Sequence, residues 1–272
     1  MAVLQAIYTY PLKSAAGVPL SRSPLEPWGL AHDRRWMLVD PGGRFVTGRA
    51  LGALVRLQAQ PSPDGLRLRW HDGSTVQVRP DSGAVAIPVQ VWRDQVLAQP
   101  VDGVIDDWLS ERLGRPLRLV YLADPLGRRF DDAGGGGLVS FADGLPLLAI
   151  STRSLQVLSS WVGRDLDLRR FRPNLVIDGL EQPFVEDRWS VLRIGGIGLR
   201  MVRPCSRCIF TTVDPDSGER DVDREPLSTL EQRRMLAEGA CFGVNLMPWP
   251  AADRSAGELA IGDRIEVLEQ SL

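Results

Sequence analysis

The run RPCSRCIFTTVDP, residues 203–215, contains two of the three cysteines of this chain, Cys205 and Cys208. Arg207 stands between them, and a nearby positive charge favours the thiolate over the thiol. A thiolate attacks electrophiles or binds soft metals. The residues after Cys208 are β-branched or aromatic, so the run predicts a strand over 209–213. It therefore indicates a β-rich fold with a reactive or metal-binding thiol, unlike the thioredoxin-type CxxC motif at a helix N-terminus.

Short β-rich stretches lie on both sides of this run. In the first hundred residues turn signals separate them, such as Pro-Gly-Gly at 41–43 and Pro-Asp-Gly at 63–65. Close spacing of short strands is typical of hairpins that close into a barrel or a sandwich. We expect strands at residues 4–8, 35–40, 54–59, 66–70, 75–78, 89–91, 175–177, 191–194, 197–202 and 263–268, with a hairpin turn at Gly195-Gly196.

Helices are few in this pattern. One is predicted over 104–113, because Gly114 follows it as a stop signal. A second is predicted over 152–161, with Ser151 or Thr152 as its N-cap. A third is predicted over 228–237, where Ser228 and Glu231 have capping-box spacing. The predicted fold class is mainly β (α+β), a mixed barrel with a few covering helices.

Residues 128–137 end in four consecutive glycines. Ordering such a run costs much backbone entropy. We therefore expect a mobile loop between the first two helices.

The bulk composition excludes several classes of protein. The chain has 272 residues, 44% of them hydrophobic, and a net charge of −2, so it can bury a large core and lacks the basic surface of a nucleic-acid-binding protein. No apolar stretch is long enough to span a membrane, and the first residues lack the positive charge of a secretory signal. An odd count of three cysteines suits a reducing compartment. These features predict a cytoplasmic protein with no membrane partner.

Lys13 is the single lysine among 32 basic residues. Its ammonium group is a compact point charge, whereas guanidinium is a broad planar fork, so a tight anion pocket distinguishes them. Lys13 is therefore a candidate anion ligand, although chance retention of one lysine explains it equally well.

Several separated motifs together resemble a known family. FRPNLVI (171–177), RPCSRC (203–208) with TTVDPDSG (211–218), and FGVN (242–245) resemble the MOSC (molybdenum cofactor sulfurase C-terminal) domain. YPLKS (10–14) and DRRW (33–36) resemble the MOSC N-terminal β-barrel domain. The chain is most similar to the mitochondrial amidoxime-reducing component and its bacterial relatives. The resemblance implies an N-terminal barrel-like domain over 1–120 and a MOSC domain over 121–272.

The resemblance also implies the residues of a molybdenum cofactor site. Cys208 corresponds to the family's metal-binding thiolate and catalytic centre. The residues implied in cofactor binding are Lys13, Ser14, Arg34, Ser151, Thr152, Arg172, Asn174, Ser206, Arg207 and Asn245. The chemistry of these residues agrees, because a molybdopterin carries a phosphate that needs local cations, and a thiolate is a soft metal ligand.

The implied activity is reduction of N-hydroxylated small molecules, amidoximes or hydroxylamines, by oxo transfer to molybdenum. No plant-type iron–sulfur spacing is present in the chain. We therefore expect electrons from a separate ferredoxin, flavoprotein or haem protein.

Other interpretations of the same residues stay open. The protein could be a cofactor carrier without turnover, or a sulfur-carrier module with a persulfide on Cys208. It could also bind pyridoxal phosphate through Lys13, the only lysine available for a Schiff base. A structural zinc site is a weaker alternative, since it needs four ligands and no second CxxC accompanies Cys205 and Cys208.

Overall fold

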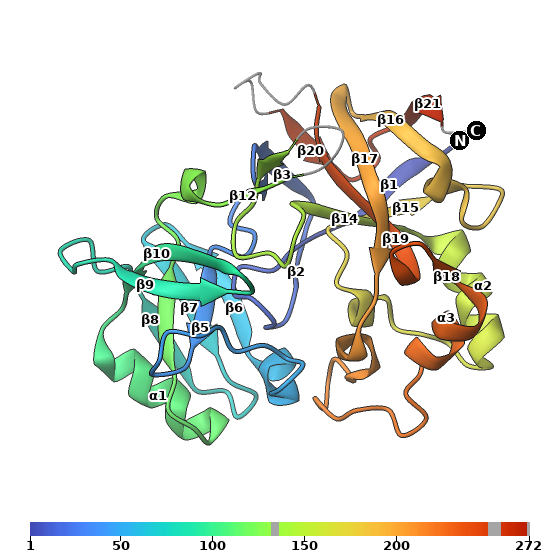
Figure 1. Ribbon diagram of the computed structural model, residues 1–272. Helices are drawn as coiled ribbons and strands as arrows, with labels where there is room; N and C mark the ends of the chain where they lie inside the picture. The colour runs from blue at the N-terminus through green and yellow to red at the C-terminus, as the bar shows by residue number, and fades with distance from the viewer. Residues whose placement is uncertain (132–135, 250–256, 271–272) are drawn as a thin grey trace.

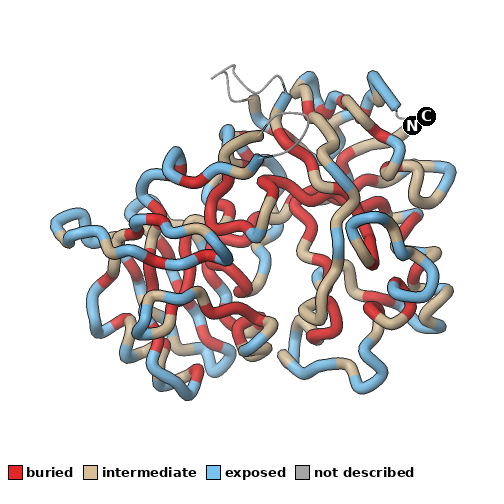
Figure 2. The backbone as a smooth tube through the Cα atoms, in the orientation of Figure 1, coloured by how far each residue is buried: buried red, intermediate tan, exposed pale blue. Residues whose placement is uncertain are grey.

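The computed structural model describes residues 1–131, 136–249 and 257–270. Two strand-rich halves lie side by side (Figure 1), and the buried segments run through the middle of each half (Figure 2). Within the described ranges, no helix is both long and apolar enough to cross a membrane. The predicted mainly β fold class is confirmed.

The C-terminal half is built on one large curled sheet of order β2-β1-β15-β14-β19-β17-β16-β21, with β18 paired to β19. All neighbours are antiparallel except β14 and β15, and a bridge between Val3 and Arg264 brings β1 next to the segment before β21. The strands are β1 (Val3–Thr9), β2 (Val18–Leu20), β14 (Leu147–Ser151), β15 (Leu175–Asp178), β16 (Trp189–Ile194), β17 (Ile197–Ser206), β18 (Met235–Leu236), β19 (Gly239–Pro248) and β21 (Ile265–Gln270).

Both faces of this sheet are apolar and covered. Along β14, Leu147 and Ala149 point to the inside of the curl, while Leu148 and Ile150 face a second core beneath the helices. This follows from the alternation of side chains along a strand. The covering helices are α2 (Thr152–Val162) and α3 (Leu227–Arg233).

The N-terminal half contains a four-stranded sheet, β5-β11-β10-β9, and a three-stranded sheet, β6-β7-β8. Helix α1 (Gly103–Leu113) buries Ile105, Leu109 and Leu113 against them. The strands are β5 (Trp36–Val39), β6 (Gln58–Ser62), β7 (Gly65–Arg69), β8 (Thr75–Val78), β9 (Ile87–Val91), β10 (Asp94–Pro100) and β11 (Arg118–Tyr121).

The two halves interleave at the start of the chain. Strands β1 and β2 belong to the large sheet, and β3 (Arg22–Glu26) pairs with both β4 (Gly29–Leu30) and β20 (Glu258–Ala260). The segment then crosses into the N-terminal half at β5. The division of the chain near residue 120 stays a prediction, and β1 pairs across it with β15.

The first two predicted helices are confirmed. Asp102 caps α1 by accepting from Val104 N, and Ser151 caps α2 by accepting from Ser154 N. Both helices end at a left-handed glycine, Gly114 or Gly163.

The third predicted helix is present, but its predicted cap and its predicted C-terminal end are wrong. α3 begins at Leu227 and ends at Arg233, and Ser228 does not cap it, since its hydroxyl donates to Asp223 O at 2.8 Å. The residues after it pair with β19, which stops the helix early.

The predicted strand over 209–213 is also wrong, because Ile209–Thr212 form a 3-10 helix, η5. The hydroxyl of Thr211 donates to Cys208 O at 3.0 Å and that of Thr212 to Ile209 O at 2.7 Å. Such local side-chain bonds compete with strand pairing. The predicted strand over 54–59 is likewise half helical, and the 3-10 helices are η1 (Gly52–Arg56), η2 (Pro125–Gly127), η3 (Leu168–Phe171), η4 (Val185–Arg188) and η5.

The predicted mobile loop lies partly outside the described residues, at 132–135. Its flanks form a short pair, β12 (Arg129–Phe130) with β13 (Gly137–Leu138). Arg128 is buried and donates to Ser140 O and to Asp94 at 2.9 Å, so the loop leaves from an anchored residue.

Candidate functional site

A cavity of about 270 Å³ lies between the two halves, with walls from both. It is lined by the loops after β1 and β5, by the residues before β14, by η3, and by the end of β17 with η5. All of the predicted site residues except two line it: Lys13, Ser14, Arg34, Arg172, Asn174, Ser206, Arg207, Cys208 and Asn245.

The two exceptions are Ser151 and Thr152. Ser151 is fully buried as the N-cap of α2, and the hydroxyl of Thr152 donates to Asp178. Neither lines the cavity, so their expected cofactor contact has no support in the geometry.

Cys208 is positioned where β17 ends and η5 begins. Its carbonyl accepts from Thr211 N at 3.0 Å, which fixes the turn, and its half-buried thiol faces Arg49 Nε at 3.2 Å from Sγ. Cys205 also lines the cavity and accepts from Arg207 at 3.0 Å, whereas Cys241 is fully buried. All three thiols are free.

Two arginines in the cavity carry unused donors. Arg172 donates Nη1 to Ala15 O at 2.7 Å, while its buried Nη2 has no hydrogen-bond partner among the described residues. Arg207 donates Nη2 to Phe171 O at 2.7 Å, and its buried Nε is likewise unpartnered. Buried donors are normally satisfied, so two charged ones in one cavity indicate space for an anionic ligand.

Backbone strain gathers around the same cavity. Ser14, Arg34 and Arg172 have φ values of 69°, 49° and 56°, in the left-handed region that non-glycine residues rarely adopt. Each such residue costs about 1–3 kcal/mol and persists only where surrounding contacts demand it. The three loops are therefore held in shapes that suit the cavity and not the local sequence.

Lys13 is buried at the wall of this cavity. Its Nζ donates to Phe141 O at 2.7 Å and forms an ion pair with Asp143. Burial lowers the pKa of Lys13 to about 8, although Asp143 partly offsets it. Burial also lowers the pKa of Arg172, to about 10. In both groups burial disfavours the charged form, and an anion placed nearby would favour it again.

Asp33 and Asn174 join the two halves beneath the cavity. Asp33 accepts from Tyr10 N at 2.8 Å and from Asn174 Nδ2 at 3.1 Å, and it pairs with Arg34. Asn174 Oδ1 accepts from Leu148 N at 3.1 Å and from Arg34 at 3.2 Å. Both ends of the Asn174 amide are thus engaged within the protein.

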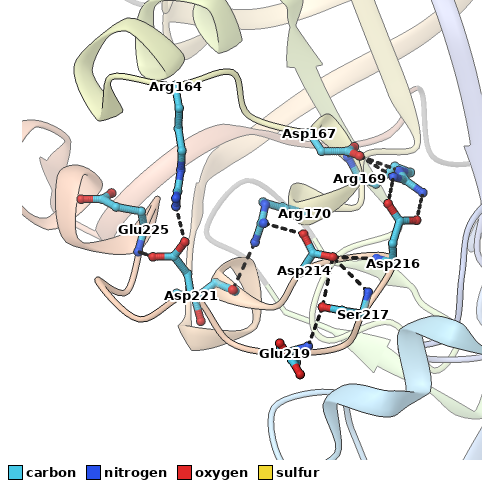
Figure 3. Close-up of polar contacts among 11 residues, drawn as sticks. Arg164, Asp167, Arg169, Arg170, Asp214, Asp216, Ser217, Glu219, Asp221 and Glu225 are labelled. Carbon is cyan, nitrogen blue, oxygen red and sulfur yellow. Dashed lines mark hydrogen bonds and ion pairs between the residues drawn. The ribbon is translucent and has the colours of Figure 1, made fainter.

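An ion-pair network holds η5 from the outside (Figure 3). Arg169 makes two bonds of 2.9 Å to Asp216, and Arg170 donates to Asp214 at 2.8 Å and to Thr212 O at 3.1 Å. The network ties η3 to the loop after η5 and so fixes the segment that begins at Cys208.

The charged cavity residues that were not anticipated from the sequence are Arg49, Asp143 and Arg170. Arg49 and Asp143 each stand beside a glycine in a loop, and a polar loop residue beside a glycine is the only sequence signal they carry. Among so many arginines that signal singles out none.

The described residues contain no group of three or more His, Cys, Asp or Glu side chains arranged to hold a metal. A metal at Cys208 would have one protein ligand in the described chain and would take the others from a bound cofactor or water. The donor set, one thiol with several cations, fits a metal carried by an anionic organic ligand.

The chain is similar in sequence to known protein families. Residues 1–116 match the MOSC N-terminal beta barrel domain and residues 137–266 match the MOSC domain. The chain is 28% identical to mitochondrial amidoxime-reducing component 1 of Homo sapiens over 284 residues, which cover 97% of this chain and 82% of that protein. It is 29% identical to molybdenum cofactor sulfurase of Oryza sativa subsp. japonica over 265 residues, which cover 89% of this chain and 32% of that protein.

Proposed function

Because this chain belongs to the MOSC family, with the N-terminal barrel domain and the MOSC domain in that order, we propose that it is a molybdenum-cofactor-dependent oxidoreductase. Its proposed substrates are N-hydroxylated small molecules such as amidoximes and hydroxylamines. Two relatives are named for amidoxime reduction and for the molybdenum cofactor, which supports this assignment.

The observation that carries the proposal is that a thiol and two arginines, each with an unpartnered donor atom, line one cavity. Cys208 supplies a soft ligand, and the unpartnered donors of Arg172 and Arg207 supply sites for phosphate oxygens. Lys13 adds a compact charge to the same lining, and Ser14 and Ser206 add side-chain hydroxyls.

When bound, the cofactor would supply a reduced metal centre able to take up the oxygen of the N-hydroxyl group and to give the substrate two electrons. The chain's own part is to hold and orient it. Arg49 donates to the Cys208 sulfur, and hydrogen bonds to a ligating sulfur tune a metal centre. The electrons would come from a separate donor protein, a ferredoxin, flavoprotein or haem protein.

Metal analysis tests the proposal. Full-length protein from a host that makes the molybdenum cofactor should contain close to one molybdenum per chain, and Cys208→Ser should lose most of it. Cys205→Ser and Cys241→Ser are matched controls, because the first changes the other thiol that lines the cavity and the second changes a fully buried thiol. Equal molybdenum in wild type and Cys208→Ser would refute the ligand assignment, and none in the wild type would refute the function.

Turnover separates the enzyme from a cofactor carrier. Loaded wild-type protein with a chemical electron donor should convert benzamidoxime to benzamidine. Bound molybdenum without conversion of any N-hydroxylated compound would favour the carrier instead.

A further inference from the structure

Next to the thiol, Arg49 and Asp143 line the cavity, and Trp92 contacts both of them from outside the lining. Arg49 Nε lies 3.2 Å from Cys208 Sγ, and the other end of its guanidinium donates to Asp143 at 2.5 Å. The same guanidinium stacks on the ring of Trp92 at 4.4 Å, and Trp92 Nε1 donates to Asp143 at 3.2 Å. Arg49 therefore links the Asp143 carboxylate and the Trp92 indole to Cys208, the proposed metal ligand.

Asp143 and Trp92 are the accessible members of this group. The Asp143 side chain keeps 51% of its surface exposed, against 5% for Lys13 and 14% for Arg34. Trp92 is 44% exposed. Asp143 and Trp92 are therefore more open to a solvent-borne ligand than Lys13 and Arg34 are.

Trp92 holds a backbone position that does not suit it. It is the first residue of the two-residue loop between β9 and β10, since Val91 pairs with Asp94, and its φ is 57°. Glycine is normal at such a position, and a bulky residue there costs about 1–2 kcal/mol. Figure 1 shows this hairpin reaching from the N-terminal half toward the C-terminal half. The hairpin needs no tryptophan for its own geometry, so the indole points to a role at the cavity.

The pair has the chemistry that recognises a planar, nitrogen-rich head group. Asp143 Oδ1 accepts from Lys13 and Trp92, and Oδ2 accepts from Arg49 alone, which leaves room for another N–H donor. An indole attracts planar cations. The chain's own Arg49 already makes both contacts with a planar N–C–N group.

We propose that Trp92 and Asp143 are the specificity-determining residues, and that they bind the planar N–C–N head of an N-hydroxylated amidine or guanidine beside Cys208. The reaction rests on the function proposed above, but the binding can be measured without turnover. Compounds with an N–C–N head and a conjugated ring are preferred over aliphatic hydroxylamines.

The test compares benzamidinium with benzamide, a neutral compound of the same shape, by calorimetry on the full-length protein. Benzamidinium should bind wild type at least ten-fold more tightly than benzamide does. Trp92→Gly and Asp143→Asn should each weaken benzamidinium binding about ten-fold or more. Trp92→Gly keeps the hairpin, because glycine accepts the φ of 57°.

Two matched controls stand outside the cavity. Trp108→Ala removes an indole that also stacks on a guanidinium, that of Arg112 at 4.1 Å, and Asp64→Asn neutralises an exposed carboxylate paired with Arg79 at 3.1 Å. Neither should change benzamidinium binding. Equal binding of the two compounds to wild type, or unchanged affinity in both Trp92→Gly and Asp143→Asn, would overturn the inference.

Kinetics separate this inference from the proposed function. In molybdenum-loaded protein, Trp92→Gly should lower kcat/KM for benzamidoxime more than for an aliphatic hydroxylamine. Reduction of both with an unchanged ratio would refute the role of Trp92 while the function stands. Reduction of neither by wild type would refute the function and leave the binding result to decide the inference.

Discussion

Anion binding to the cavity should weaken as the pH rises through 8, because Lys13 loses its proton there. The groups that face Lys13 Nζ are Asp143, which raises its pKa, and Arg128 and Arg34, which lower it; burial is the largest influence and brings the pKa to about 8. An anion bound beside Lys13 needs the ammonium form. Affinity is therefore full below this pKa and falls above it.

The size of the effect follows from the pKa of about 8. About 90% of Lys13 is protonated at pH 7 and about 10% at pH 9, so affinity should fall about nine- to ten-fold, or ~1.3 kcal/mol, between them. Sulfate is a suitable probe because its charge does not change in this range. Calorimetry or the sulfate dependence of the melting temperature measures the affinity in the protein without cofactor.

Lys13→Met is the matched variant, since it keeps the length of the side chain and removes the charge. It should bind sulfate weakly, with no loss between pH 7 and 9. A wild-type affinity that stays constant over this range, or the same pH dependence in Lys13→Met, would refute the assignment of the titrating cation to Lys13.

Three further outcomes are expected. Asn174→Ala should lower the free energy of unfolding by about 2 kcal/mol or more in urea titrations, because Leu148 N and Asp33 lose buried partners; a loss under 0.5 kcal/mol would contradict that network. Gly48→Ala should reduce the molybdenum content, because the added Cβ would collide with the Phe210 ring beside Cys208. Gly103→Ala is the control: its Cβ meets nothing within 4 Å, so the molybdenum content should stay unchanged. Burial raises the pKa of Glu186, so the folded state binds more protons than the unfolded state, and stability falls as the pH rises above the ordinary glutamate pKa. Glu186→Gln should flatten this fall of the melting temperature between pH 5 and 8. The same dependence of melting temperature on pH in wild type and variant would contradict it.

The electrons for the reaction should be supplied by another protein. A reconstituted system in which a ferredoxin, flavoprotein or haem protein supports benzamidoxime reduction would confirm this. Turnover with a pyridine nucleotide alone would contradict it.

Local chemistry determined the elements that the sequence could predict. Gly114 and Gly163 end α1 and α2 because only glycine enters the left-handed region at no steric cost, and Ser151 caps α2 through its own hydroxyl. Gly195-Gly196 makes the β16–β17 hairpin for the same reason, with φ values of 56° and 90°. These interactions span a few residues, so the sequence is enough to find them.

The strand predicted over 209–213 shows where composition misleads. β-branched residues favour strands on average, but Thr211 and Thr212 bond their hydroxyls to carbonyls three residues back and tighten the chain into η5. That turn is what presents Cys208 to the cavity.

The amino-acid sequence by itself determined a β-rich fold, the ends of its first two helices and, through separated motifs, a thiol and a set of cations belonging to one family. Only the tertiary structure decided which of the many arginines surround the thiol. Arg49, Asp143 and Trp92 come from three distant loops, and they meet because the N-terminal half packs across the cavity from η5. Such contacts depend on how whole sheets pack, and no local pattern along the chain shows which distant residues will meet.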